Sequence, residues 1–113
     1  MILTFTLPSP PTANNLFFNI QGRGRSRTKE YNDWLERAGW HVKTATLHSD
    51  RPEAPYKVTY IVPRSLRGDL ANREKAMSDL LVKLGILKDD SLIDKLSMER
   101  ADREDVLVTV EAA

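Results

Sequence analysis

Apolar and polar positions alternate with a period of two residues in several short stretches of the chain, which is the pattern of half-buried β-strands. In the first of these stretches Leu3, Phe5 and Leu7 share one face. Prolines close two of the stretches, and a proline cannot donate a hydrogen bond to a neighbouring strand. The strands predicted from this alternation cover residues 2–7, 56–62, 92–98 and 106–110.

Two longer stretches repeat their apolar positions every three to four residues, which is the period of an amphipathic helix. In the first stretch, Thr28 can cap a helix that begins at Lys29 and runs toward Ser49. In the second, a turn at residues 68–69 leads into a helix that Gly85 can end, because a glycine with positive φ often follows the last helical turn. One helix therefore precedes the second predicted strand and one follows it.

The resulting order is strand, helix, strand, helix, strand, strand. It predicts an α+β fold in which two helices pack on one small mixed sheet. The 113 residues suit a single domain, 1–113. Residues 8–28 are rich in Pro, Gly, Asn and Ser, so we expect a long basic loop there, and such loops are usually functional or mobile.

The charges of the chain are nearly balanced but unevenly distributed. The net charge of +1 argues against a protein that coats nucleic acid by electrostatic attraction alone. Residues 1–75 hold 12 basic and 7 acidic side chains, whereas residues 76–113 hold 5 basic and 9 acidic ones. A basic surface and an acidic site can therefore occur together in this protein.

Two absences narrow the class of protein. The chain has no cysteine, which excludes a disulfide framework and a cysteine-ligated zinc site. Residues 1–7 are apolar but lack a basic start and are followed at once by prolines, so we expect neither a signal peptide nor a membrane span. The composition, 41% hydrophobic and 29% charged, is that of a folded chain, and we expect a cytoplasmic protein with no membrane partner.

Acidic side chains surround the second predicted helix. Asp69 stands at the end of the second strand or at the cap of this helix, Asp79 lies on its polar flank, and Asp89 and Asp90 follow it. Gathered carboxylates repel one another, and Mg²⁺ or Mn²⁺ would relieve that repulsion. Lys75 could steady the charge of a phosphate. The cluster forms only if the strand after Asp90 returns alongside the helix; otherwise Asp69 caps the helix and Asp89 and Asp90 form a solvated turn.

Basic side chains are concentrated in the segment 22–29, which has no acidic residue and two glycines. Its cations are Arg23, Arg25, Arg27 and Lys29. Such a flexible segment can follow a phosphate backbone, although a merely solvated loop explains it equally well. Further cations, Arg64, Arg67 and Arg73, extend the positive charge toward Asp69. The meeting of both signs at one end of the helix favours a phosphodiester substrate.

Several motifs together resemble one known family. They are Pro-Thr-Ala-Asn-Asn at 11–15, the apolar stripe at 31–34, and the spacing D-x-x-N-x-x-K-x-x-x-D followed by G-x-x-x-D-D. The last two motifs comprise Asp69, Asn72, Lys75, Asp79, Gly85, Asp89 and Asp90. In this pattern the chain resembles the RusA family of Holliday junction resolvases, which are small, often prophage-encoded endodeoxyribonucleases.

The resemblance implies a homodimer that binds four-way DNA junctions and cuts two strands symmetrically with Mg²⁺ or Mn²⁺. It assigns catalytic roles to Asp69, Lys75 and Asp90 and metal binding to Asp69 and Asp90, with Asp79 and Asp89 as further candidate ligands. The residues that we expect to contact DNA are Asn14, Asn15, Arg23, Arg25, Arg27, Lys29, Arg67, Asn72 and Arg73.

One position departs from the family pattern. The common motif is D-x-D-N, but this chain has Ala71 where the second Asp stands. Three outcomes follow: Asp69 and Asp90 suffice with water ligands, Asp79 or Asp89 substitutes, or the nuclease is impaired. The alternatives to a nuclease are a junction-binding protein of the same fold that does not cleave, and an RNA-binding module, which needs aromatic residues on an open sheet face.

Overall fold

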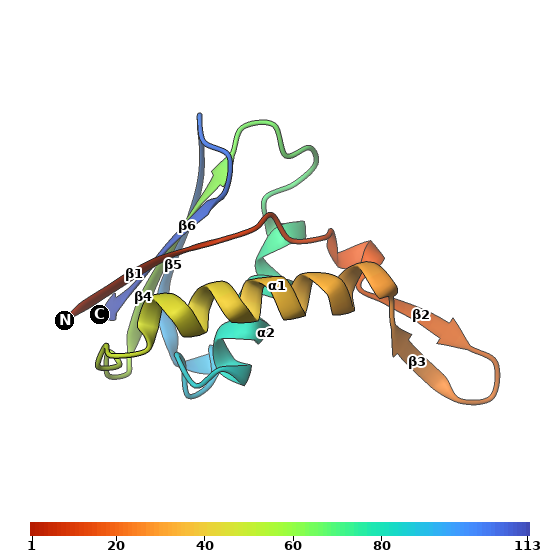
Figure 1. Cartoon of the computed structure of the whole chain (residues 1–113), viewed down its shortest axis with the longest axis horizontal. Helices are drawn as coiled ribbons and strands as arrows, with labels where there is room; N and C mark the ends of the chain where they lie inside the picture. The colour runs from red at the N-terminus through yellow and green to blue at the C-terminus, as the bar shows by residue number, and fades with distance from the viewer.

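The computed structural model describes residues 1–113 and contains two sheets, two α-helices and two short 3₁₀ helices (Figure 1). The elements in chain order are β1 (Ile2–Leu7), η1 (Ala13–Asn15), β2 (Phe17–Ile20), β3 (Gly24–Arg27), α1 (Lys29–Thr46), β4 (Tyr56–Pro63), α2 (Ala71–Lys83), η2 (Asp90–Leu92), β5 (Ile93–Ala101) and β6 (Val106–Ala112). The α+β fold predicted from the sequence is confirmed, and no helix has the length and hydropathy needed to cross a membrane.

The larger sheet has the strand order β1-β6-β4-β5. Strand β6 is antiparallel to both of its neighbours, whereas β5 is parallel to β4. A parallel pair needs a crossover connection, and α2 supplies it. Both helices lie on the same side of this sheet, and the buried apolar side chains of β1, β4 and β6 face them (Figure 1).

Helix α2 is tied to the middle of the sheet by a small buried polar network. The Tyr60 and Ser78 hydroxyls lie 2.8 Å apart, and Ser78 Oγ donates to Glu74 Oε1 at 2.7 Å. Burial raises the pKa of the Tyr60 phenol. The helix then stops at Gly85, whose φ of 75° confirms the predicted glycine stop.

The prediction of a long loop over residues 8–28 is wrong for the second half of that segment. Strands β2 and β3 form an antiparallel hairpin, with Phe17 opposite Arg27 and Ile20 opposite Gly24. Gly22 in the turn has a φ of 74°, a conformation that side chains with a Cβ rarely adopt. The segment that we expected to be flexible is therefore a hairpin, and Figure 1 shows it extending from the start of α1, away from the larger sheet.

Smaller boundary corrections follow from backbone pairing. Helix α1 begins at Lys29 with Thr28 as its cap, as predicted, but ends at Thr46. Strand β5 begins one residue later than expected and continues to Ala101, because its pairing with β4 extends to Pro63. The turn before β6 is therefore limited to residues 102–105.

Candidate functional site

The N-terminal end of α2 presents three of the predicted functional side chains. Asp69 lies in the loop between β4 and α2, and Asn72 and Lys75 lie in the first turns of the helix, all exposed to solvent. Asp69 is neither at the end of the strand nor at the cap, because β4 ends at Pro63 and no side chain caps α2. No protein group bonds the Asp69 carboxylate, which is therefore available to a ligand.

Lys75 and Asp79 form an ion pair one turn apart on the helix. Lys75 Nζ lies 3.3 Å from Asp79 Oδ2, and the two side chains are 58% and 40% exposed. Burial, and then the charge of Asp79, raise the pKa of Tyr31 on α1. Asp79 is thus partly neutralised, whereas Asp69 is not.

Two arginines hold this end of the helix in place. Arg73 Nη1 donates to the Pro10 carbonyl at 2.6 Å and Nη2 donates to the Arg67 carbonyl at 3.3 Å. Arg73 Nε is buried without a hydrogen-bond partner. From β5, Arg100 Nη2 donates to the Gly68 carbonyl at 2.5 Å. The loop that carries Asp69 is therefore fixed by residues distant from it in sequence, and Arg73 has a positioning role.

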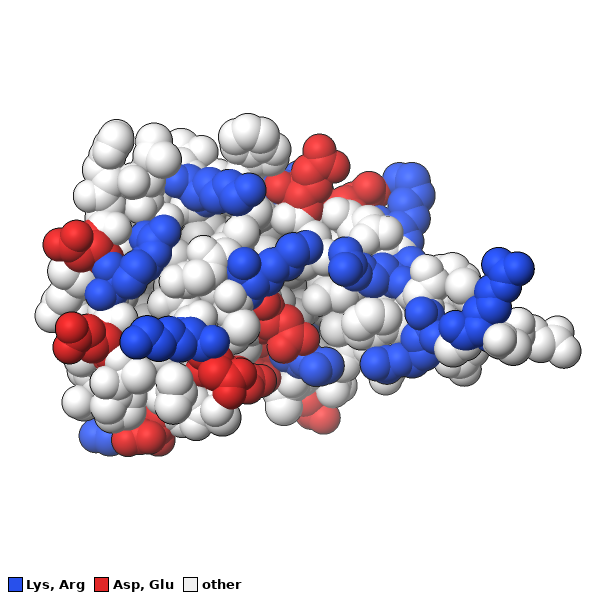
Figure 2. All heavy atoms as spheres, turned by 90° about the horizontal axis from the view of Figure 1, so that it is seen from below, with Lys and Arg blue, Asp and Glu red and all other residues white.

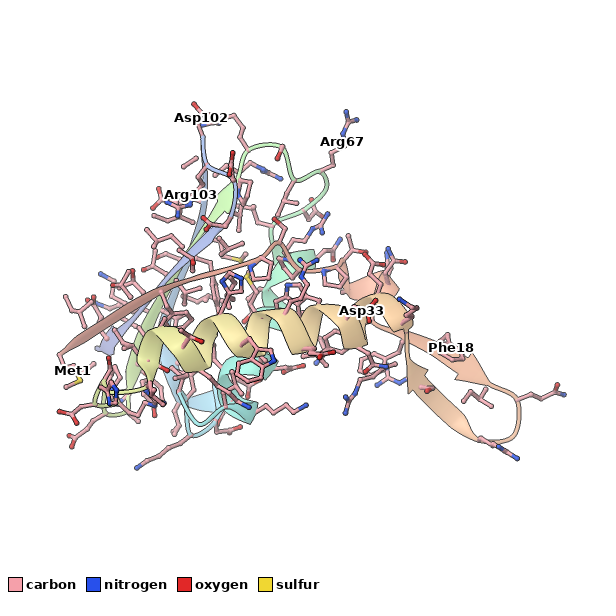
Figure 3. All side chains as sticks on the ribbon, in the orientation of Figure 1. Met1, Phe18, Asp33, Arg67, Asp102 and Arg103 are labelled. Carbon is pink, nitrogen blue, oxygen red and sulfur yellow. The ribbon has the colours of Figure 1, made fainter.

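The other two cations near Asp69 differ in their surroundings. Arg64 Nε donates to Asp102 Oδ1 at 2.9 Å, so its charge is already paired. Arg67 makes no side-chain hydrogen bond and points outward from the loop before α2 (Figure 3). Of the residues expected to carry positive charge toward Asp69, Arg67 is the one whose guanidinium is free.

The pair Asn14 and Asn15 belongs to the same end of the molecule. Asn14 and Asn15 lie in η1, which packs against α2, and both side chains are exposed. Thr28 Oγ1 donates to the Asn15 carbonyl at 2.7 Å, so the cap of α1 also holds η1. The structure thus brings the Asn pair and the start of α2 to one side of the molecule.

The hairpin carries the basic residues and is anchored on α1. The Phe17 ring meets the edge of the Tyr31 ring with centroids 5.6 Å apart, and Arg25 Cζ lies 4.4 Å from the centre of the Phe17 ring. A shallow hollow of about 400 Å³ lies beside these groups. It is lined by Phe17, Arg25, Ser26, Arg27 and Asn32.

Basic side chains dominate the hairpin end of the molecule, as seen from below in Figure 2, whereas the rest of that face mixes both signs. Arg23, Arg25 and Arg27 are all exposed. Lys29 at the start of α1 is instead paired with Asp33 at 2.7 Å, and this hydrogen bond raises the pKa of Lys29. The arginines are therefore the freer part of the basic set.

Phe18 is a residue that sequence reasoning overlooked. Its side chain is 50% exposed on the hairpin (Figure 3) and is paired with Ser26, so it lies on the face opposite to Arg25 and Arg27. An exposed aromatic ring on a basic hairpin can stack on nucleic-acid bases. The available signal was the pair of aromatic residues directly before the basic glycine-rich run.

Asp89 and Asp90 lie at the opposite end of α2. The strand after them does return alongside the helix, as required, but they stand at its start. Thirteen helical residues span about 20 Å, which separates Asp90 from Asp69. Figure 1 shows the loop before α2 above the helix and the cyan segment after it below. The prediction that these acidic residues form one cluster is therefore wrong within a single chain. No three acidic or histidine side chains of the chain gather for a metal ion.

Asp89 has a partner of its own within η2. The Ser91 hydroxyl donates to Asp89 Oδ2, and this hydrogen bond is the main reason that the pKa of Asp89 is lowered. Asp90 is exposed in the first position of η2. The expected solvated turn is thus a short 3₁₀ helix that displays two carboxylates.

The sheet face turned away from the helices contains no aromatic side chain. Its outward positions include Thr4, Thr59 and Ser97, while the aromatic residues of β1 and β4 face the core. Recognition of RNA on an open sheet depends on aromatic rings that stack on bases. The structure therefore gives no support to the RNA-binding alternative.

Comparison with known protein families finds one match. The family described as Endodeoxyribonuclease RusA matches residues 8–111, which include the hairpin, both helices and strands β4 to β6. A sequence search of curated proteins finds no match. The family match covers both ends of α2 and the hairpin.

Proposed function

Because the chain belongs to the RusA endodeoxyribonuclease family, we propose that it resolves four-way junctions and other branched DNA by hydrolysing phosphodiester bonds. Members of this family are nucleases that act on Holliday junctions and bind branched DNA. We further propose which residues react and which ion they bind, and that the two cuts are paired and symmetric.

The observation that carries the proposal is the meeting of an unpartnered carboxylate with cations at one end of α2. Asp69 has no bonding partner, Lys75 stands two turns further along, and the arginine hairpin lies on the same side through η1. A nuclease needs positive charge to hold the DNA backbone and a carboxylate at the scissile phosphate.

The residues act on different parts of the DNA. Arg23, Arg25 and Arg27 bind phosphates outside the reacting one, and each such contact releases counterions, so binding weakens as salt rises. Asn14 and Asn72 offer amide groups that hydrogen-bond the backbone near Asp69. Lys75 Nζ, held by Asp79, stabilises negative charge that develops on the scissile phosphate.

Nucleases of this kind depend on a divalent metal ion, and we propose Mg²⁺ or Mn²⁺ because both prefer carboxylate oxygens. A metal of this type would neutralise phosphate charge and activate water. The acidic residues of one chain do not form a complete metal site, because Asp69 stands alone and Asp89 and Asp90 lie at the far end of α2. We assign the missing ligands to a second copy of the chain, since paired cutting also requires a homodimer.

A second candidate function is junction binding without cleavage, and Ala71 favours it. Ala71 is exposed in the first position of α2 and provides no oxygen ligand beside Asp69. A protein of this kind would retain the arginine hairpin and bind junctions, but would not cut them with any divalent ion.

Cleavage of a synthetic four-way junction in Mg²⁺ or Mn²⁺ distinguishes the two functions. We expect the wild type to cut and both Asp69→Asn and Asp90→Asn to lose at least about 100-fold in rate, since removal of one key electrostatic group costs that much. Asp50→Asn is the matched control, because Asp50 is an exposed carboxylate outside both ends of α2. Equal cutting by all four proteins would contradict the proposed site, and tight binding with no cutting would identify the non-cleaving protein.

A further inference from the structure

The β2–β3 hairpin has two faces of different character. Residues opposite each other in an antiparallel pair point to the same face, and successive residues of one strand point to opposite faces. The first face holds Phe17, Asn19, Arg25 and Arg27. The second face holds Phe18, Ile20 and Ser26. The arginines of the strands therefore lie on one face and Phe18 lies on the other.

The aromatic ring of the first face is used by the fold. The Phe17 ring meets the edge of the Tyr31 ring on α1, and the Arg25 guanidinium lies over the Phe17 ring. Phe17 also packs against the buried core. The first face is thus anchored on α1, while Arg25 and Arg27 remain exposed around the anchor.

Phe18, by contrast, is not packed into the fold. Its side chain is 50% exposed, it makes no contact with another aromatic ring, and it is not among the side chains that pack against the core. Figure 3 shows Phe18 on the hairpin, which extends away from the larger sheet. The exposed part of the ring contributes little to folding and is available to a ligand.

The charges around Phe18 favour an anionic ligand. Three exposed arginines lie on the same hairpin, and residues 17–27 include no acidic side chain. Trp40 is also exposed, but it lies on α1 between side chains of both signs, Glu36 and Lys43. An aromatic ring on a purely basic element suits a nucleotide, because cations attract the phosphate and the base stacks on the ring.

We propose that Phe18 stacks on a base at the branch point of a DNA junction, while the arginines of the opposite face bind phosphates of an adjoining arm. This role rests on the function proposed above, because it requires a branched DNA substrate. Phe18 would then determine specificity, since it contacts the DNA but not the reacting phosphate.

The two faces of the hairpin explain why a branch point is preferred to a linear duplex. A straight duplex can lie along one face but not along both, because the faces point in opposite directions. Bases inside a duplex are also covered by their neighbours, and unstacking them costs free energy. At the centre of a junction the arms diverge, and bases where strands change partner are unstacked at less cost. A duplex therefore uses the arginines alone, whereas a junction uses the arginines and Phe18.

Fluorescence anisotropy without a divalent ion tests this role independently of cutting. The probes are an immobile four-way junction and a linear duplex with the sequence of its arms. Phe18→Ala should weaken junction binding by about 10-fold or more, since one base–aromatic stack is lost. Duplex binding and the salt slope of junction binding should stay unchanged, since no cation is lost. Leu47→Ala, at a residue 72% exposed, is the matched control and should alter neither affinity. Equal losses on both probes, or no loss on either, would overturn the proposal.

Two further variants separate stacking from a merely apolar contact. Phe18→Tyr keeps the ring and should retain junction affinity within about twofold. Phe18→Leu keeps an apolar side chain without a ring and should bind the junction as weakly as Phe18→Ala. Wild-type affinity in Phe18→Leu would overturn the proposal. So would an oligomer that dissociates in Phe18→Ala during sedimentation while junction affinity stays unchanged, because the ring would then contact a second copy of the chain.

Photochemical cross-linking locates the base that Phe18 contacts. An iodouracil base at the branch point reacts on irradiation with an aromatic side chain stacked on it, and mass spectrometry identifies the residue. We expect a cross-link to Phe18 from the branch point and none from the middle of an arm. Equal cross-links from the two positions, or a cross-link to Trp40 in place of Phe18, would overturn the proposal.

The outcome for Phe18 is distinguishable from the outcome for the nuclease. If the wild type cuts the junction in Mg²⁺ or Mn²⁺ but Phe18→Ala binds it as tightly, the role of Phe18 is wrong and the nuclease function stands. If Phe18→Ala loses junction affinity but the wild type does not cut, the nuclease function fails and the contact with the branch point stands.

Discussion

The two ends of helix α2 both display carboxylates, but they are built differently. At the N-terminal end, the hydrogen bonds of Arg73 and Arg100 hold together the loop after β1, the loop after β4 and the last residues of β5. The C-terminal end is local: after Gly85 the chain buries Ile86 and Leu87, and then η2 presents Asp89 and Asp90 with only Ser91 as a side-chain partner.

This difference indicates which end of α2 can hold a DNA strand in position. Distant segments that are tied together hold the Asp69 loop in one arrangement relative to η1 and the hairpin. The η2 end supplies carboxylates next to the exposed Lys88, but it does not include the arginine hairpin. The functional centre that we propose therefore lies at the N-terminal end, and in this proposal the C-terminal end contributes ligands only if another surface is brought to it.

Removing the hairpin charges should produce the largest effect on this contrast. Replacing Arg23, Arg25, Arg27 and Lys29 by Gln should weaken junction binding by about 100-fold at low salt and reduce the salt slope by about 3 to 4. Filter binding or fluorescence anisotropy over a salt series measures both. The matched control removes four exposed cations outside the hairpin, from α1, α2 and the loop after α2, namely Arg37, Lys43, Lys83 and Lys88. Equal losses in the two sets would show that DNA does not prefer the hairpin end.

Removing the hydrogen bonds of Arg73 at the N-terminal end of α2 should reduce the stability of the fold. Arg73→Met removes two hydrogen bonds from a charged donor to the Pro10 and Arg67 carbonyls, and we expect a loss of about 2 kcal/mol in the free energy of unfolding. Urea denaturation measures it. Arg67→Met is the control, because that side chain is exposed and unbonded, and it should stay within about 0.5 kcal/mol of the wild type. An unchanged free energy of unfolding for Arg73→Met would show that the loop keeps its arrangement without these hydrogen bonds.

Adding a carboxylate at position 71 should increase the difference between the N-terminal and C-terminal ends of α2. An aspartate in the first turn of α2 should stabilise the helix by about 0.3–1 kcal/mol through the helix dipole. It should also tighten Mn²⁺ binding by about tenfold, equivalent to about 1.4 kcal/mol. Thermal unfolding and calorimetric Mn²⁺ titration measure these changes. Ala71→Asn is the uncharged control; the same Mn²⁺ affinity in both variants would show that position 71 does not face the ion.

The smallest effect is expected at η2. Ser91→Ala removes the hydrogen bond that holds the pKa of Asp89 below its ordinary value, so the pKa of Asp89 should rise. Because the folded pKa lies below the unfolded one, the charged carboxylate adds stability above the ordinary pKa, and this stability is lost as pH falls through the folded value. Carboxyl NMR titration measures the shift. Ser65→Ala, at an exposed serine elsewhere, should leave Asp89 unchanged.

Local periodicity accounts for what could be predicted about the fold. The four strands of the larger sheet and both helices follow from repeats of two or of 3.6 residues, which report the solvent exposure of each position. The hairpin was missed because β2 and β3 have four residues each, and the arginine and glycine run is typical of a flexible loop. Its stability comes from Phe17 on Tyr31 and from Thr28, contacts that local patterning does not contain.

The sequence by itself determined the elements, the Thr28 cap, the Gly85 stop and the placement of Asp69, Asn72 and Lys75 at one end of a helix, because these depend on neighbours within one or two turns. The tertiary structure decided that Asp89 and Asp90 stay apart from Asp69 within one chain, that Arg73 ties a loop, and that β5 is an open edge. These features depend on which strand bonds which and in what direction, and here β5 is parallel to β4. Pairing between distant segments is set by the sum of many contacts, and no short stretch of sequence records it.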